Sequence, residues 1–286
     1  MLKAKLQNFL RRFLPFVGIE LNRSAGMQSM LRQELEAIRQ KVKQLTPTNP
    51  ALKGYKCYSQ FDEDGIIAHL TDTLQIERGC FVEFGSGNGL ENNSHLLLLK
   101  GWRGLWVDGD PVNGSFIRSN LPLHTTRLAY DSTFITIKNI RGVIEKGLKH
   151  VASQNIDLYS MDLDGNDVYF TDEVLKYWRP KIVICEYNGK IPFGLRLSVE
   201  YDENSKREED DYFGASLSEH IARLKGYRLV CCGLSGVNAF FVRDDLADKF
   251  ITYDPVHLYQ PARVHLTFMA VGSRPSLKFL AQTLRS

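Results

Sequence analysis

The stretch Phe81-Val-Glu-Phe-Gly-Ser-Gly-Asn-Gly89 decides the fold. A short apolar run containing Glu83 gives way to three alternating glycines, Gly85, Gly87 and Gly89. Glycine accepts positive φ angles and lets the backbone approach a ligand closely. A second apolar run, LWV at residues 105–107, ends at an acid, Asp108. A strand, a glycine turn and an acid after the next strand are how α/β proteins hold an adenosine, with the carboxylate on the ribose hydroxyls.

The spacing of the glycines indicates which adenosine ligand fits. Sites for dinucleotides read G-x-G-x-x-G and place a pyrophosphate at the start of the helix. Here the glycines alternate, and Glu83 would repel a phosphate but attract a sulfonium or an α-amine. The pattern E-x-G-x-G-x-G resembles that of S-adenosylmethionine (SAM) methyltransferases. The alternative is a tight turn from strand to helix that holds no ligand.

Length and composition favour one α/β domain with an appendage, in 286 residues. Because 36 Lys and Arg stand against 33 Asp and Glu, there is no bulk positive field, and we expect no nucleic acid partner. Five cysteines show neither C-x-x-C pairing nor zinc spacing. They indicate free thiols in a reducing compartment, and we expect a cytoplasmic protein.

The first 50 residues differ from the rest and predict two amphipathic helices and a linker, so that residues 51–286 form the main domain. The first helix is basic, and the second carries an apolar stripe that includes Leu31, Leu35 and Val42. Both stripes could pack on the main domain or on a second copy of the chain. Alternatively, residues 1–47 make peripheral contact with the inner face of a membrane. No apolar run approaches the roughly 20 residues of a membrane span.

From about residue 55 the chain alternates between strand-like and helical patterns, which predicts a parallel sheet covered on both faces. Strands are expected at 80–84, 104–107, 127–130, 157–161 and 181–185, with helices at 62–75, 92–100, 112–120, 134–150 and 167–178. After a helix at 216–225, the runs 227–232 and 239–243 are joined by the short turn GLSG at 233–236, too tight for a crossover. They predict an antiparallel hairpin.

A mostly parallel, Rossmann-like sheet with an antiparallel strand near the C-terminus is the arrangement of class I methyltransferases. Several segments resemble the FkbM-type SAM-dependent methyltransferases, more closely the branch associated with bacterial surface-polysaccharide biosynthesis. They are YSQFDEDGII at 58–67, FVEFGSGNG at 81–89 with ENNS at 91–94, GWRGLWVD at 101–108, DLYSMDLDGND at 157–167, ICEYN at 184–188 and KGYRLV at 225–230. Together they cover roughly residues 55–245.

The resemblance implies SAM as cofactor and O-methylation of a small-molecule or glycan acceptor, such as a sugar hydroxyl of a cell-surface glycan or its precursor. It also implies that Ser59 and Gln60 lie on the cofactor side, whereas the alternative for both is helix capping. The family often has Glu-Pro after the second strand, and this chain has Asp108 and Gly109. The carboxylate is retained but is one methylene shorter.

Acids and an amide follow the fourth and fifth strands: Asp162, Asp164, Glu186 and Asn188. Alternate residues of an extended chain share a face, and the ends of parallel strands meet at one edge, so these side chains should face one another over the acceptor. O-methylation needs a base for the hydroxyl proton, or a divalent cation that lowers the pKa of the hydroxyl. Asp162, Glu186 and Asn188 offer the oxygen ligands that Mg²⁺ prefers. The alternative is a strand-to-helix turn capped by Asn166 or Asp167.

Two further functions remain open at this point. The chain could be a membrane-recruited scaffold or binding protein that retains SAM binding without transfer, or an enzyme that uses NAD or a nucleotide sugar. Histidines, chiefly His95 and His220, compete with the carboxylates for the role of base.

Overall fold

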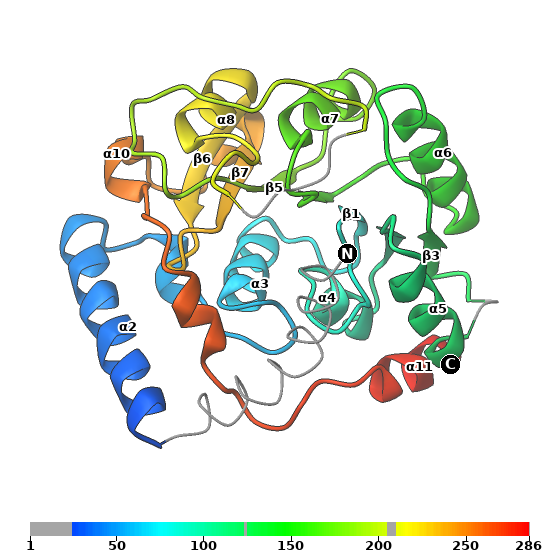
Figure 1. Cartoon of the computed structure of the whole chain (residues 1–286), viewed down its shortest axis with the longest axis horizontal. Helices are drawn as coiled ribbons and strands as arrows, with labels where there is room; N and C mark the ends of the chain where they lie inside the picture. The colour runs from blue at the N-terminus through cyan, green and yellow to red at the C-terminus, as the bar shows by residue number, and fades with distance from the viewer. Residues whose placement is uncertain (1–24, 123–124, 205–209, 286) are drawn as a thin grey trace, which may run out of the picture.

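The computed structural model describes residues 25–122, 125–204 and 210–285. These residues form a seven-stranded sheet in the order β3-β2-β1-β4-β5-β7-β6 (Figure 1). All neighbouring strands run parallel except for the two pairings of β7, which are antiparallel. The strands are β1 (Cys80–Phe84), β2 (Arg103–Val107), β3 (Leu128–Asp131), β4 (Leu158–Met161), β5 (Ile182–Glu186), β6 (Tyr227–Cys232) and β7 (Asn238–Arg243).

Helices cover both faces of the sheet. They are α2 (Ala25–Leu45), α3 (Glu63–Thr73), α4 (His95–Leu99), α5 (Pro111–Asn120), α6 (Ile140–His150), α7 (Asp167–Val174), α8 (Leu217–Arg223), α9 (Asp244–Ala247), α10 (Pro255–Leu258) and α11 (Lys278–Arg285), with 3-10 helices η1 (Pro50–Lys53) and η2 (Val264–Phe268). Figure 1 shows α3 and α4 on one side of the sheet and α7 and α8 on the other.

The two faces follow from the alternation of side chains along each strand. In β1, Phe81 packs into the core on the side of α3 and α4, whereas Val82 and Phe84 pack into the core on the side of α6 and α7. In β5, Ile184 and Cys185 divide in the same way. Because both faces are buried, these strands are apolar except for Glu83 in β1 and Glu186 at the end of β5, as expected for a parallel sheet.

The chain reverses its direction of winding between β1 and β4. From β1 it proceeds outward through β2 to β3, and then returns by way of α6 to β4 on the other side of β1. In open α/β sheets, ligands bind beyond the carboxyl ends of the strands at such a switch point. The glycine turn follows β1 and Asp162 follows β4, so both predicted halves of the site meet there.

The predicted fold class, a Rossmann-like and mostly parallel sheet with a reversed strand near the C-terminus, is confirmed. The expected hairpin is present, with Cys232 opposite Ala239. The reversed strand β7 is not at the edge, however. It inserts between β5 and β6, so that Glu186 at the end of β5 stands beside Asn238 of β7.

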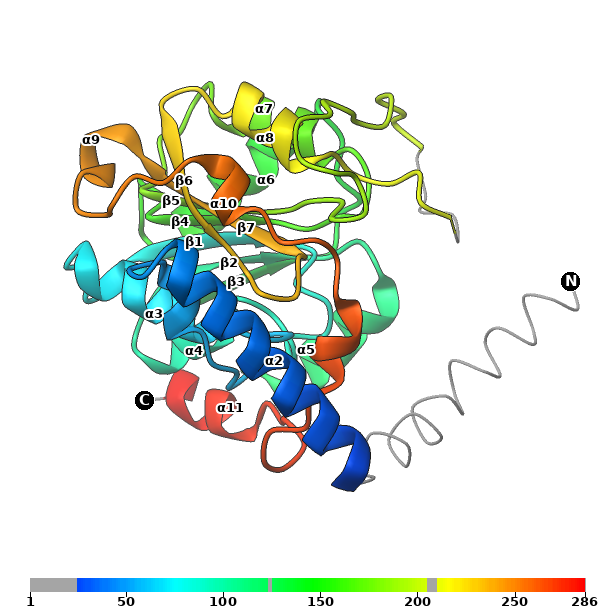
Figure 2. The ribbon, with the colours of Figure 1, turned by 90° about the vertical axis from the view of Figure 1, so that its left-hand side faces the viewer.

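The second of the two predicted N-terminal helices is α2, and it packs on its own domain. Leu31, Leu35 and Val42 are buried in the same core as Phe61 of the main domain. Figure 2 shows α2 running along the side of the domain. The first predicted helix lies outside the described residues. Among the helices that are described, none combines the length and the apolar character needed to cross a bilayer.

Leu35→Ala is expected to lower the free energy of unfolding by about 2–4 kcal/mol, because it removes a buried side chain from this packing. Met30, on the same helix, is 71% exposed, so Met30→Ala is the control and should change stability little. Urea denaturation of the two variants measures the difference. Equal, small effects would mean that α2 contributes no packing energy.

Candidate functional site

All three glycines of the turn have a positive φ, but the space beside them differs. A Cβ at Gly85 would lie 1.7 Å from the backbone oxygen of Asp162, and one at Gly89 would lie 2.7 Å from the ring of Trp106. At Gly87 a Cβ would meet nothing within 4 Å. Gly85 and Gly89 therefore pack the turn against the protein, whereas Gly87 presents bare backbone to open space.

Asp108 fixes the turn from the neighbouring strand. The Gly87 amide donates to Asp108 Oδ2 at 2.8 Å, while the Asp110 amide and the Asn113 side chain donate to Oδ1 at 2.9 and 3.0 Å. A carboxylate accepts about four hydrogen bonds, so Asp108 retains capacity for one more. Its position fits the predicted ribose contact, but with one hydroxyl rather than two.

Glu83 has a role that the sequence did not predict. It is buried, and its carboxylate accepts hydrogen bonds from the amides of Asn93 and Ser94 and from the Ser94 hydroxyl. Burial raises the pKa of Glu83 to about 7, although these hydrogen bonds act to lower it. Glu83 therefore joins β1 to the start of α4. Three internal donors account for its position without a cationic ligand, so a contact with SAM stays a prediction.

Polar atoms without a hydrogen-bond partner among the described residues surround the turn. They include Ser86 Oγ, both polar atoms of the Asn92 amide and His95 Nε2, all buried. His95 Nδ1 lies 2.7 Å from the Gly89 oxygen, which can only accept, so Nδ1 carries the proton and Nε2 is left as an acceptor. The ring of Tyr58 stacks on His95 with centroids 3.9 Å apart.

Buried polar groups normally find partners, so this cluster fits a polar ligand that supplies them. Sequence reasoning did not single out Tyr58, Ser86 or Asn92, although all three stand inside the segments that carry the family resemblance. Their signal was their place in those motifs, next to Ser59 and the glycines.

The Ser59 side chain is engaged within its own loop. Its hydroxyl donates to Asp64 Oδ2 at 3.0 Å, and that oxygen also accepts from the amides of Cys57, Tyr58 and Ser59. The Ser59 hydroxyl also accepts from the Asp64 amide in the first turn of α3 at 3.1 Å, as in the capping alternative. Gln60 is exposed, and the cofactor-side position of both residues stays a prediction.

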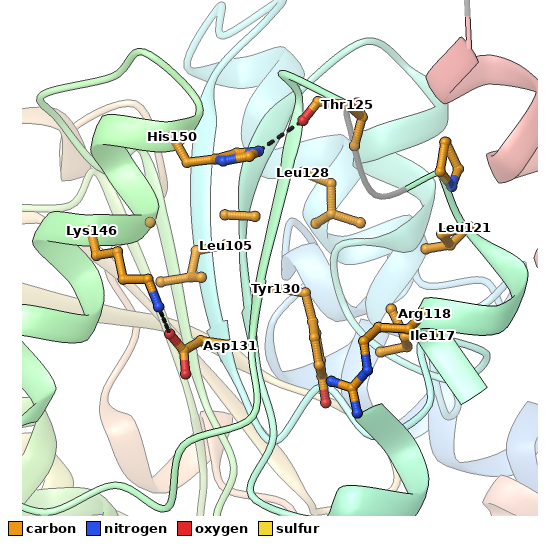
Figure 3. Close-up of a pocket in the computed structure, with 13 residues that line it drawn as sticks. Leu105, Ile117, Arg118, Leu121, Thr125, Leu128, Tyr130, Asp131, Lys146 and His150 are labelled. Atoms are coloured by element: carbon orange, nitrogen blue, oxygen red, sulfur yellow. Dashed lines mark hydrogen bonds and ion pairs between the residues drawn. The ribbon is translucent and has the colours of Figure 1, made fainter. Parts of the chain in front are cut away.

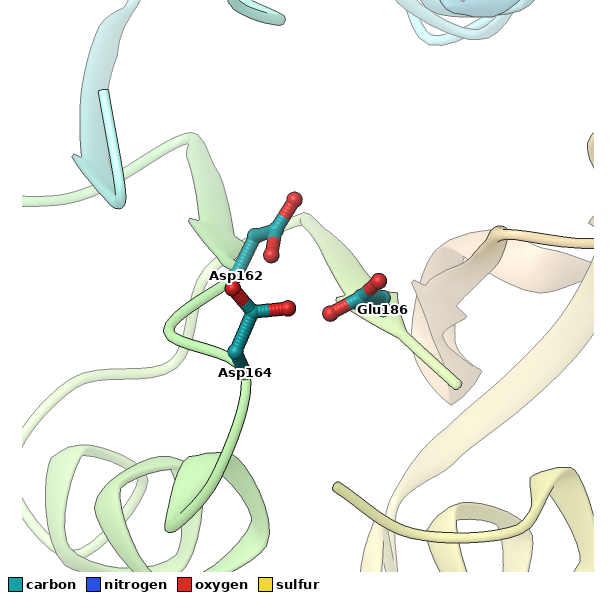
Figure 4. A group of neighbouring side chains, drawn as sticks. All are labelled: Asp162, Asp164 and Glu186. Carbon is teal, nitrogen blue, oxygen red and sulfur yellow. The ribbon is translucent and has the colours of Figure 1, made fainter. Parts of the chain in front are cut away.

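The three predicted acceptor-side carboxylates come together. Asp162, Asp164 and Glu186 each have a carboxylate oxygen within 4.8 Å of the others, and Figure 4 shows the three groups converging from the ends of β4 and β5. Asp162 also touches the cofactor side, since its backbone oxygen blocks any side chain at Gly85. It thus joins the glycine turn to the acidic cluster.

The cluster is electrostatically strained. Burial and the nearby Asp162 and Asp164 raise the pKa of Glu186 well above its usual range, and Glu186 Oε2 has no partner among the described residues. Burial and Asp162 raise the pKa of Asp167 to about 8. Like-charged carboxyl groups in a shared, desolvated site resist full ionisation, so this site favours the protonated form of Glu186.

Asn188 holds the loop after β5. Its amide donates to the backbone oxygens of Asp211 and Phe213, and its oxygen accepts from the Lys190 amide. The amide oxygen keeps a second lone pair, so a role of Asn188 on the acceptor side stays a prediction.

The side chains of Asn166, Asp167 and His220 also bond to nearby backbone. Asn166 exchanges two hydrogen bonds with the backbone of Asp202, and Asp167 accepts from the Leu163 amide. Burial lowers the pKa of His220 to about 4, and this ring bonds to the backbone of Glu186. His220 is thus neutral and supports the end of β5.

No protein-family model matches the sequence, and a search of curated proteins also found no match. Similar solved structures include an O-methyltransferase from Bacillus cereus in complex with S-adenosylhomocysteine (SAH), at 15% identity over 79% of this chain and 94% of that one, with a TM-score of 0.40. Another is the O-methyltransferase TomG from Streptomyces achromogenes, involved in tomaymycin synthesis and in complex with SAM (14%, 62%, 78% and 0.39). A third is the N-terminal domain of EvdMO1 in the presence of SAH and D-fucose (11%, 73%, 95% and 0.40). At these identities no residue's role and no substrate is transferred to this chain.

Proposed function

We propose that this protein is a SAM-dependent O-methyltransferase that acts on a sugar hydroxyl of a cell-surface glycan or its precursor. The observation that carries the proposal is the position of Asp162 at the switch point of the sheet. Its backbone lies against Gly85 of the adenosine-type turn, and its side chain belongs to the acidic cluster with Glu186. A cofactor side and a proton-accepting side thus share one residue. The FkbM-type motifs support a sugar acceptor.

On the cofactor side, separate residues would contact different parts of SAM. The open backbone at Gly87 admits the ligand, the remaining acceptor capacity of Asp108 suits a ribose hydroxyl, and Asn92 and His95 offer unpartnered polar atoms. When bound, SAM supplies an electrophilic methyl group on a sulfonium. A cationic centre also suits the surplus of carboxylates at this edge of the sheet.

On the acceptor side, one proton must pass from the acceptor hydroxyl to a carboxyl group of the cluster. As the acceptor oxygen gains the methyl group, its O–H bond breaks and the proton must leave. The raised pKa of Glu186 favours its protonated form, so Asp162 is the carboxylate placed to accept the new proton. Asp164 adds a third carboxylate oxygen within 4.8 Å of the other two, and its negative charge favours protonation of its neighbours.

A divalent cation is a second way to use the same three carboxylates. Asp162, Asp164 and Glu186 supply the hard oxygen ligands that suit Mg²⁺. Its binding would require Glu186 to give up its proton, so affinity would rise with pH.

The proposed function is tested by incubating the full chain with methyl-labelled SAM and cell-surface glycans or their lipid- and nucleotide-linked precursors. We expect label in the carbohydrate fraction that resists mild base, as an ether does. Binding of SAM without any transfer to these fractions would instead support the scaffold alternative.

Asp108→Ala should weaken SAM binding at least tenfold. The mutation removes one charge-assisted hydrogen bond to the ligand, worth roughly 1.5–3 kcal/mol, and frees the Gly87 amide. Asn113→Ala removes only one support of the Asp108 carboxylate and should change affinity less than threefold. Calorimetric titration of both variants decides; unchanged affinity in Asp108→Ala would place the ribose elsewhere.

A further inference from the structure

Four arginines line an open pocket at the opposite end of the sheet from the acidic cluster. This arginine pocket lies where β1, β2 and β3 begin, beside the last turn of α11. Its lining residues include no acid, and its four arginines are Arg78, Arg103, Arg127 and Arg285.

Two of the guanidinium groups converge over Gly101. Arg78 Nε lies 3.6 Å, and Arg127 Nη1 4.0 Å, from the point that a Cβ of Gly101 would occupy. Gly101 has a φ of 91°, a conformation open to glycine, and the missing side chain leaves both cations facing the same space. Two like charges held this close favour an anion between them.

Carbonyl groups, not carboxylates, hold the inner arginines in place. Arg127 donates to the backbone oxygens of Leu98 and Thr283, and Arg103 donates to the oxygen of Val151. These bonds orient the guanidinium groups and leave their charges unneutralised. Arg78 is exposed and has no bonded partner among the described residues.

No described carboxylate forms an ion pair with any of the four arginines. Asp157 lies next to Gly79, but its Oδ2 accepts from the Cys80 amide and its Oδ1 pairs with Lys181 at 2.8 Å. The positive charge of the pocket is thus uncompensated across the part of the chain that the structure describes.

A neighbouring cavity on the β3 edge shows the contrast. It measures about 230 Å³, and its floor is apolar, with Leu105 and Leu128 (Figure 3). There Lys146 pairs with Asp131 at 2.9 Å, and the His150 ring bonds to the Thr125 oxygen at 2.8 Å. Lys146 of that cavity thus pairs with a carboxylate, whereas no described carboxylate pairs with the four arginines of the arginine pocket.

We propose that the arginine pocket binds a phosphate-bearing ligand, of the diphosphate class in particular. Guanidinium groups match the oxygens of phosphates with paired hydrogen bonds, and four cations without an acid suit a ligand with two or more negative charges. The site is independent of methyl transfer, since the length of the strands separates it from Asp162. A soluble diphosphate and a phosphate-bearing lipid headgroup share this chemistry.

Titration of the full chain with pyrophosphate, at low and at physiological salt, tests the proposal. The double variant Arg78→Gln/Arg285→Gln removes two exposed guanidinium groups that no described hydrogen bond uses, so the fold should remain. We expect its affinity for pyrophosphate to fall at least tenfold. Arg32→Gln/Arg274→Gln removes the same charge from exposed positions outside the pocket and should change affinity less than twofold.

Absence of pyrophosphate binding by the wild type, or equal losses in the two double variants, would overturn the proposal. Flotation with phosphatidylglycerol vesicles, against phosphatidylcholine vesicles, then distinguishes the two sources. Flotation that depends on Arg78 and Arg285 and is competed by pyrophosphate identifies a lipid headgroup. Pyrophosphate binding without such flotation identifies a soluble diphosphate. SAM binding should be unchanged in both variants, so this test is separate from that of the methyl-transfer function.

Discussion

Gly85→Ala is expected to cost the protein its stable fold. The added methyl group would lie 1.7 Å from the backbone oxygen of Asp162, and the φ of 77° would strain any side chain. Because the obstacle is backbone, neither β1 nor β4 can yield without losing pairing between them. We expect a loss of more than about 3 kcal/mol in the free energy of unfolding, a large share of a typical domain's stability.

Two other glycine-to-alanine substitutions serve as controls for the loss of stability in Gly85→Ala. Gly87→Ala meets no atom within 4 Å, so it should cost only about 1–2 kcal/mol for its left-handed backbone. Its SAM affinity should nevertheless fall more than tenfold, because the methyl group occupies the space in front of the turn. Gly142→Ala, within α6 and also without contacts, should stabilise the fold by about 0.5–1 kcal/mol. Thermal unfolding and calorimetry separate the three; a folded Gly85→Ala would contradict the close packing of the turn.

Asp162→Asn should lower turnover by roughly 10²–10⁴, the usual contribution of a positioned proton acceptor, while SAM affinity changes little. The amide keeps the shape and the backbone contact with Gly85 but cannot accept the hydroxyl proton. Removing one negative charge should also move the pKa of Glu186 back toward its usual range, since Asp162 is among the groups that raise it. The pH dependence of the remaining activity reports that shift.

Asp248→Asn is the control for Asp162→Asn, because the Asp248 side chain is 89% exposed and pairs only with Arg228 at the surface. It should leave turnover unchanged. Chelation separates the two roles of the cluster: EDTA should abolish activity, and Mg²⁺ restore it, only if the carboxylates hold a cation. Near-normal turnover in Asp162→Asn would falsify its assignment as the proton acceptor.

The sequence predicted the sheet well because its signals are local. Apolar runs bounded by glycines located β1 and β6 to the residue, and the GLSG turn predicted the hairpin. The insertion of β7 between β5 and β6 could not be predicted, since a strand buried on both faces carries no mark of its neighbours. The helix α11 was also missed, although Leu280, Ala281 and Leu284 show its helical spacing.

In the candidate site, too, some features could be predicted from the sequence and others could not. The convergence of Asp162, Asp164 and Glu186 followed from the rule that parallel strands end at one edge. The role of Asn188 did not, because its partners are backbone oxygens that lie 23 and 25 residues further along the chain. Glu83 was assigned to SAM from its motif, and its hydrogen bonds from the nearby amides of Asn93 and Ser94 were not predicted. Strand-end position predicts where a side chain lies better than it predicts which partner it takes.

Calorimetric titration of the full chain with SAM, SAH and NAD tests the central claim most directly. The open backbone at Gly87, the spare acceptor capacity of Asp108 and the unpartnered atoms of Asn92 and His95 predict one site per chain that binds SAM and SAH, with NAD weaker than both. If no binding heat is measured with SAM or with SAH, or if NAD binds more tightly than both, the claim that this edge of the sheet is a methyl-donor site is contradicted.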